Sequence, residues 1–436
     1  MLQTCLVSKE EIIVLKETIF KYKKYISMFL VAGLLFARCN LGLYFGGPYV
    51  ITNVIFNALA FVFCLILAFD NKHILKKAVC NPALIWIMAF SLMVFIYGHF
   101  KLFTAADYYS RMMTVLTVAP AVLILIILFY NKEDVLSILG VSGSVVIITT
   151  LITSLCYDYV WGEWLMGMYS RVGATPAGGC IDTGNLVLIL LIPILYQLIV
   201  YKKIKQYLWI TLIGIFEIVA TGAKSSVLPI VFVFAIMIVG ASDDKRIIRR
   251  NLIILGVAAV VAFAAIMIVP PLYGVVGYRI AELFTGVNAA EPDLHTSTGQ
   301  RMAMIAAFKA HFWEAPLFGH GFYSFREMPY SQIEEYRIGT EIAYRNVQLH
   351  MNFLEVLFSY GIVGFVLYYW FPVYVIIKTF RANKMAKIMV FSIMISFLFM
   401  DMGIDMYYKY LLPYYSYFLA YYFMVHGHSG FKIVKG

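Results

Sequence analysis

The stretch Arg345-Asn-Val-Gln-Leu-His-Met-Asn-Phe-Leu-Glu355 gathers polar side chains directly before an apolar run that contains Gly361 and Gly364. Polar groups at the mouth of a membrane helix cost free energy unless they are paired or used. Residues 276–349, which lead into the quoted stretch, form a polar segment long enough for a small lobe outside the membrane. We therefore expect any chemistry to take place where this lobe meets the helix that follows it.

The composition of the whole chain is that of a membrane protein. It is 62% hydrophobic and only 13% charged, whereas soluble domains carry about 25% charged residues. The net charge is +10, but the basic residues fall in short clusters between apolar runs. This distribution is typical of membrane topology and argues against a groove for nucleic acid.

A spanning helix needs roughly 20 mostly apolar residues. By that criterion we predict an all-α fold, namely a polytopic integral membrane protein with about 12 transmembrane helices that forms a single domain over residues 1–436. The expected spans are 24–45, 49–69, 82–100, 112–130, 134–156, 183–201, 206–222, 224–241, 251–275, 350–377, 386–401 and 406–425.

Lysine-rich segments between the spans predict the topology. Short loops on the cytoplasmic side of a membrane protein carry an excess of Lys and Arg. Placing residues 72–77, 202–205 and 245–250 on that side puts both termini in the cytoplasm. Residues 276–349 then form one large extracytoplasmic loop between the ninth and tenth helices.

The basic residues assigned to the outer side are mainly arginines, in contrast to the lysines inside. The planar guanidinium group binds phosphate with two parallel hydrogen bonds. One interpretation is that these arginines converge on an anion such as a lipid diphosphate. The other is that they form ordinary salt bridges with acidic residues of the loops. The residues concerned include Arg171, Arg279, Arg301 and Arg345, with Lys224.

Three further features have both a functional and a structural interpretation. His350 is placed to act as a base or a hydrogen-bonding group, or it is a satisfied interfacial histidine. Glu217, inside an apolar span, is either a functional carboxylate or the partner of Lys224 in a structural ion pair. Gly361 and Gly364 are expected to allow close helix packing.

The cysteines and acidic residues give no metal-ligand spacing, so we predict no metal and no cofactor. Cys156 and Cys180 flank an outer loop, and a disulfide between them in an oxidising compartment stays an open alternative. The chain also lacks the glycine-rich phosphate loop of ATP-driven proteins.

Four motifs occur in a fixed order and suggest a family. They are Arg171-Val-Gly-Ala-Thr-Pro176, Thr221-Gly-Ala-Lys-Ser-Ser226, Gly299-Gln-Arg301 with Pro316-Leu-Phe-Gly-His-Gly321, and His350-Met-Asn-Phe-Leu-Glu355 with Gly361-Ile-Val-Gly364. Together they resemble the bacterial O-antigen ligase and O-antigen or capsule polymerase superfamily of membrane glycosyltransferases. The resemblance covers roughly residues 165–375. Lys224 stands where arginine is usual in the family, which keeps the charge but loses the planar fork.

The resemblance implies a glycosyltransferase whose donor is an undecaprenyl-diphosphate-linked oligosaccharide. No nucleotide is needed, because the diphosphate is already a good leaving group. His350 and Arg301 would be the catalytic residues. The residues that would bind the diphosphate or the glycan are Arg171, Lys224, Arg279, Arg345 and Asn352.

Within this superfamily we favour a polymerase that joins lipid-linked repeats on the outer side of the cytoplasmic (inner) membrane. The first alternative is a ligase that transfers the glycan to lipid A core. An alternative of another class is a flippase or transporter of lipid-linked oligosaccharide, although the sequence lacks the two similar halves that such a protein would favour. Expected partners are membrane lipid, a chain-length regulator and a separate flippase, and no nucleic acid.

Overall fold

The computed structural model describes residues 9–41, 48–70, 73, 76, 80–99, 118–166, 168, 171–269, 273–277, 297–321, 324–338, 341–346, 348–404 and 411–426. Its long helices are α1 (Lys9–Phe36), α2 (Pro48–Asp70), α4 (Pro82–His99), α6 (Val118–Tyr130), α7 (Val135–Tyr157), α9 (Cys180–Ile199), α10 (Ile204–Thr221), α11 (Lys224–Ala241), α12 (Lys245–Ile268), α17 (Asn352–Thr379), α18 (Lys384–Asp401) and α19 (Leu411–His426). Each predicted span coincides with one of these helices.

The chain is an all-α polytopic membrane protein, as the sequence predicted. Within the described residues, eight helices are long and apolar enough to cross a membrane, and α4 and α6 are apolar but shorter. The count of about twelve spans stays a prediction. The clearest shift concerns α1, which begins at Lys9 instead of the predicted 24. Helix α12 also begins before the predicted 251, where the side chain of Asp244 caps it by accepting a hydrogen bond from the backbone N–H of Arg246.

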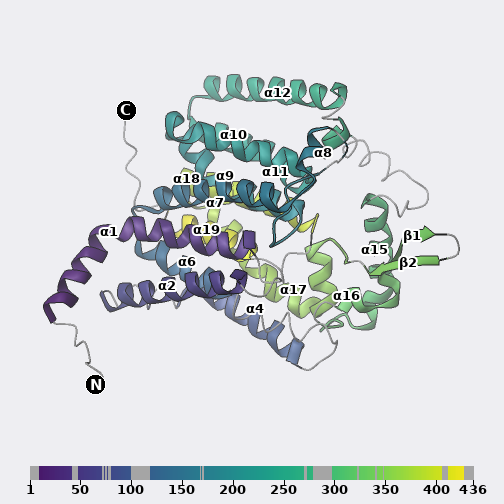
Figure 1. The fold of residues 1–436 in the computed structure, drawn as a ribbon, viewed down its shortest axis with the longest axis horizontal. Helices are drawn as coiled ribbons and strands as arrows, with labels where there is room; N and C mark the ends of the chain where they lie inside the picture. The colour runs from purple at the N-terminus through teal and green to yellow at the C-terminus, as the bar shows by residue number, and fades with distance from the viewer. Residues whose placement is uncertain are drawn as a thin grey trace.

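The helices lie side by side in a bundle (Figure 1). Helix α9 is its core, because 83% of its most apolar window is buried and it packs against α7, α10, α11 and α18. A helix that is apolar all round is buried inside a protein or faces lipid. Helix α12 shows the second case, since none of its residues is buried.

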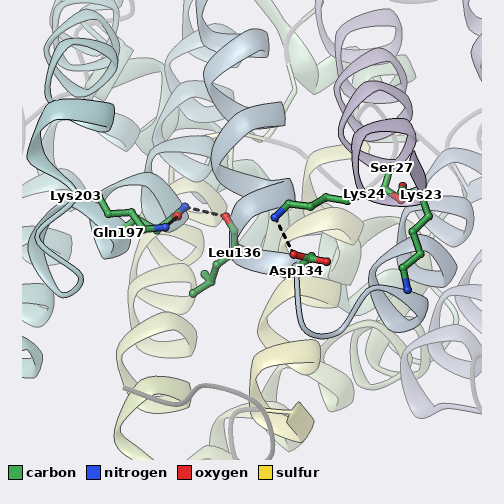
Figure 2. Close-up of polar contacts among 7 residues, drawn as sticks. All are labelled: Lys23, Lys24, Ser27, Asp134, Leu136, Gln197 and Lys203. Atoms are coloured by element: carbon green, nitrogen blue, oxygen red, sulfur yellow. Dashed lines mark hydrogen bonds and ion pairs between the residues drawn. The ribbon is translucent and has the colours of Figure 1, made fainter. Parts of the chain in front are cut away.

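Polar contacts gather the predicted cytoplasmic segments at one end of the bundle. Lys24 forms a 2.8 Å ion pair with Asp134. Gln197 donates a 2.8 Å hydrogen bond to the Leu136 carbonyl and accepts a 3.1 Å bond from the Lys203 ammonium (Figure 2). Segments that the topology assigns to one side therefore do meet. Which side is cytoplasmic stays a prediction.

The polar segment before α17 forms a small lobe at one side of the bundle (Figure 1). It contains α15 (Ser297–His311), η4 (Phe312–Glu314), α16 (Ser324–Glu327), η5 (Pro329–Ser331) and the antiparallel strands β1 (Gln332–Ile338) and β2 (Glu341–Asn346). The hairpin was not predicted. Met304, Phe308, Phe325, Leu349 and Phe358 form the lobe's own apolar core.

Helix α17 is broken at Gly361, which has φ 64° and ψ −165°. A helix would pair the N–H groups of Ile362 and Val363 with the carbonyls of Phe358 and Ser359. Here both N–H groups turn instead to a neighbouring loop. The expectation that Gly361 serves close helix packing is therefore wrong, because its backbone conformation interrupts the helix.

Residues 316–321, which we call the docking loop, replace the two lost helical bonds with four backbone hydrogen bonds. Ile362 and Val363 donate to the carbonyls of Pro316 (2.9 Å) and Leu317 (3.1 Å), while the N–H groups of His320 and Gly321 donate to the carbonyls of Phe358 and Ser359, both at 2.9 Å. All four backbone groups exposed by the break are thus satisfied. The docking loop makes a tight glycine turn, since Gly319 and Gly321 have φ of 71° and 110°.

Candidate functional site

Residues 171–178, which we call the Arg171 loop, are fixed by a buried carboxylate. Asp158, after α7, accepts hydrogen bonds from the backbone N–H groups of Gly173 (2.8 Å) and Ala174 (3.0 Å). The N–H of Val172 donates to the Ala220 carbonyl at 3.2 Å. Gly173 has φ 111°, a conformation that favours glycine. These bonds hold Arg171 beside the last turn of α10.

Residues 221–226, which we call the Lys224 turn, join α10 to α11 with almost no loop. Gly222 ends α10 in the left-handed conformation with φ 55°, which is common for a helix C-cap. Ser225 then donates a 2.9 Å hydrogen bond to the side chain of Asn185 on α9. Lys224 is the first residue of α11, and an ammonium group at the positive end of a helix is unfavourable unless an anion binds there.

Arg301 on α15 reaches the same region. Its Nη2 donates a 3.1 Å hydrogen bond to the carbonyl of Gly403, after α18. A Cβ atom at Gly403 would lie 3.2 Å from the Cβ of Ser225, so Gly403 packs directly on the Lys224 turn. The structure therefore brings Arg301, the Lys224 turn and the Arg171 loop to one end of the bundle.

A hydrogen-bonded relay connects the start of α17 with the end of α18. The Asn352 amide donates to the Tyr369 hydroxyl at 3.1 Å, and that hydroxyl donates to Asp401 Oδ2 at 2.8 Å. Asp401 is buried, and its other oxygen has no hydrogen-bond partner among the described residues. Asp401 lies two residues before Gly403, so the relay ends next to the contact made by Arg301.

His350 has an unusual backbone. Its φ is 54°, which puts a residue with a Cβ in the left-handed region, at a cost of roughly 1–2 kcal/mol. Leu349 and Asn352, on either side of it, are both fully buried and hold the segment in place. Strained residues that persist in this way gather at functional sites. His350, whose side chain is half-buried, lies two residues before the helix that carries the relay.

Residues 207–369 match a family model described as O-antigen ligase. The segment is of the O-antigen ligase family. The predicted resemblance is thereby confirmed over residues 207–369, and no curated protein matches the chain. The ligase-family segment runs from α10 to α17, so it contains the Lys224 turn, α15, the docking loop and His350. The Arg171 loop precedes it.

The predicted site residues have different outcomes in and around the ligase-family segment. Arg171, Lys224, Arg301, His350 and Asn352 all come from the elements just described. Their roles in catalysis and binding stay predictions. Two further residues that were predicted to bind substrate are not brought to this site by any described contact. Arg345 is on β2 of the lobe hairpin, and Arg279 is outside the described residues.

Asp401 is a candidate that sequence reasoning missed. It lies beyond the ligase-family match, and no motif contains it. The signal that was available is an acidic residue at the end of an apolar span, because such residues are rare unless they function. The sequence does not indicate its partner, since Asn352 and Tyr369 belong to a different helix.

Two structural interpretations offered by the sequence are wrong. Cys156 and Cys180 are both free thiols, so they form no disulfide. Glu217 forms no ion pair with Lys224, because neither carboxyl oxygen of Glu217 has a hydrogen-bond partner within the described parts of the chain. Glu217 on α10 and Lys224 on α11 therefore do not stabilise each other by pairing.

The docking loop is also linked to the lobe by charged groups. Glu314 accepts a 2.7 Å hydrogen bond from His311 and lies 3.7 Å from His320 Nε2. The His311 hydrogen bond holds the pKa of the Glu314 carboxyl below its usual value. The His320 ring stacks on Phe358 at a centroid distance of 4.1 Å, so the loop contacts α17 through side chains as well as backbone.

Tyr369→Phe tests the relay. Removing the hydroxyl leaves the Asn352 amide and Asp401 Oδ2 without this partner in a buried place, which costs about 1–3 kcal/mol. We expect a lower thermal unfolding midpoint of the detergent-solubilised protein. Tyr374→Phe, a half-buried tyrosine of the same helix, is the matched control. Equal midpoints for the two variants would show that the relay contributes nothing.

Proposed function

We propose that the protein is a membrane glycosyltransferase that moves a glycan from a lipid diphosphate to an acceptor hydroxyl, with ligation of O-antigen to lipid A core as its reaction. The match of residues 207–369 to the O-antigen ligase family supports the ligase alternative over the polymerase favoured by the sequence alone. The observation that carries the proposal is the contact of Arg301 with Gly403 beside the Lys224 turn.

The cationic groups serve the leaving group. Arg171, Lys224 and Arg301 come from three separate segments to one end of the bundle, and α11 adds the positive end of its dipole. A diphosphate bound there would have its charge neutralised as the bond to the sugar breaks. The donor needs no nucleotide for this step. Holding the donor and the acceptor close together in the right orientation would raise the rate further.

His350 serves the acceptor. The acceptor oxygen attacks the anomeric carbon of the donor sugar, and the bond from that carbon to the phosphate oxygen breaks with its electron pair on the diphosphate. The acceptor's proton passes to the imidazole of His350. General-base catalysis of this kind contributes about 10²–10⁴-fold. The rigid backbone at His350 supports this role because it fixes the ring without a flexible loop.

The proposed location follows from the predicted topology. The site end of the bundle would face outward from the cytoplasmic membrane, where the lipid-linked donor arrives after a flippase has moved it. Membrane lipid is the solvent for the donor's tail. A chain-length regulator would be needed only if the reaction were polymerisation.

Reconstitution in liposomes tests the proposed function. The purified protein receives one defined undecaprenyl-diphosphate-linked oligosaccharide, with neither nucleotide nor added metal, and products are separated on a gel. We expect transfer to lipid A core when it is present and no product without it. Arg301→Ala should abolish that product. A ladder of longer lipid-linked glycans without core would mean polymerase, and movement of the glycan between leaflets without transfer would mean transport.

A further inference from the structure

Glu217 is a carboxyl group without a partner inside the bundle. It lies on α10, one turn before the Lys224 turn, with 3% of its surface exposed. Neither of its oxygens has a hydrogen-bond partner among the described residues. Burying an ionised carboxylate without a cation or hydrogen bonds is very costly, and such a group takes up a proton instead.

Glu217 lines a small cavity whose empty volume of about 170 Å³ includes space open to solvent, and the cavity itself has no room for a water molecule. Thr183 Oγ1, another lining atom, is buried and also lacks a partner in the described parts of the chain. Trp161 donates to Ser154 Oγ at 3.0 Å, and Thr221 donates to the Ile218 carbonyl at 2.7 Å. The lining residues are Leu151, Ser154, Trp161, Gly173, Thr183, Glu217 and Thr221.

Among the described residues, no charged side chain forms a hydrogen bond with Glu217. No other acidic or basic residue lines the cavity. The elements packed around it carry charged groups, and none of these lines the cavity. They are Asp158 and Arg171 around the loop, Glu163 on α8 (Trp161–Leu165), Asp182 on α9 and Lys224 on α11.

One wall of the cavity belongs to a loop and not to a helix. Gly173 lines the cavity and is held there by the 2.8 Å bond from its N–H to Asp158. The same loop carries Arg171. Any displacement of the Arg171 loop would therefore open the cavity to water and give Glu217 the solvent that an ionised carboxylate needs.

We propose that Glu217 is a proton-binding site that stays neutral while the Arg171 loop closes the cavity. When the loop opens, the O–H bond of the carboxyl breaks, the proton passes to the entering water and the electron pair stays on the carboxylate. Proton binding and loop closure are then linked, so each favours the other. This site goes beyond the proposed function and does not depend on it.

Infrared spectroscopy of the full-length protein in lipid nanodiscs tests the proton. An exposed glutamate has a pKa of about 4.3 and is ionised at pH 7. We expect a carboxylic-acid carbonyl band at pH 7 that shifts with ¹³C-labelled glutamate and disappears in Glu217→Gln. Thr183→Val, the matched variant of the same cavity, should keep the band. If Glu217→Gln removes only carboxylate bands, Glu217 is ionised and the proposal is overturned.

Two variants test the link to the loop. Asp158→Asn weakens the bonds to Gly173 and Ala174. Gly173→Val opens the loop by a second route, because even a Cβ at this position would lie 3.1 Å from the Thr221 methyl group. Amide hydrogen exchange of residues 171–178 reports the opening. In whichever variant exchange rises, we expect the labelled acid band to be replaced by carboxylate bands. Faster exchange with an unchanged acid band would overturn the link.

Discussion

Replacing Gly361 by alanine is expected to destabilise the protein by about 3–5 kcal/mol and to abolish transfer. A Cβ at Gly361 would overlap the carbonyl of Leu317 and lie 2.6 Å from the Phe318 nitrogen. These are backbone atoms of the docking loop and cannot swing aside. The positive φ alone costs alanine roughly 1–2 kcal/mol. The clash also weakens the four docking bonds, each of which contributes about 0.5–1.5 kcal/mol when intact.

The matched control is Gly256→Ala on α12, where a Cβ would meet nothing within 4 Å. Alanine is the better helix former by about 1 kcal/mol, so this variant should unfold at the same temperature as the wild type or higher. Thermal unfolding in detergent compares the two. Gly319→Ala attacks the same contact from the other side, since its Cβ would overlap the backbone of Ser359. An unfolding temperature of Gly361→Ala equal to that of Gly256→Ala would contradict the role of Gly361 in the docking contact.

His350→Ala is expected to lower the rate of glycan transfer by about 10²–10⁴-fold, the usual contribution of a general base. The protein should remain folded, because the side chain is only half-buried. His350→Gly separates strain from chemistry. Glycine accepts the φ of 54°, so this variant should be no less stable than His350→Ala and equally inactive.

His311→Ala is the matched histidine control for this experiment. His311 bonds Glu314 in the lobe and has no proposed part in the chemistry, so its loss should change the transfer rate by only a few-fold. Initial rates with saturating lipid-linked donor give the comparison. Transfer by His350→Ala at the wild-type rate would remove His350 from the catalytic role.

The sequence predicted the helices well because a membrane restricts them strongly. Every spanning segment must satisfy its own backbone hydrogen bonds, so length and hydropathy alone located each long helix. The glycine turn of the docking loop was also predictable, since Gly319 and Gly321 are close together. The partner of the docking loop was not predictable. A sequence pattern does not distinguish a glycine that allows close helix packing from a glycine that breaks a helix.

The site was predicted only in part, because the sequence shows which residues are charged but not how the helices are rotated against one another. Basic residues on the outer side are conspicuous in an apolar chain, and Arg301 and Lys224 do reach one end of the bundle. The relay from Asn352 through Tyr369 to Asp401 crosses two helices and depends on the rotation of each about its axis. The cavity at Glu217 likewise requires four helices and the Arg171 loop to meet. The β hairpin lacks the apolar alternation that signals a half-buried strand.

The most direct test of the central claim is a double-mutant cycle on binding of undecaprenyl diphosphate. Affinities are measured in nanodiscs for the wild type, Lys224→Ala, Arg301→Ala and the double variant, with undecaprenyl monophosphate as the reference lipid. If both cations hold one diphosphate, each single variant weakens its binding more than that of the monophosphate, and their effects are coupled by about 0.5 kcal/mol or more. Wild-type affinity in both single variants, or strictly additive losses, would contradict a shared diphosphate site.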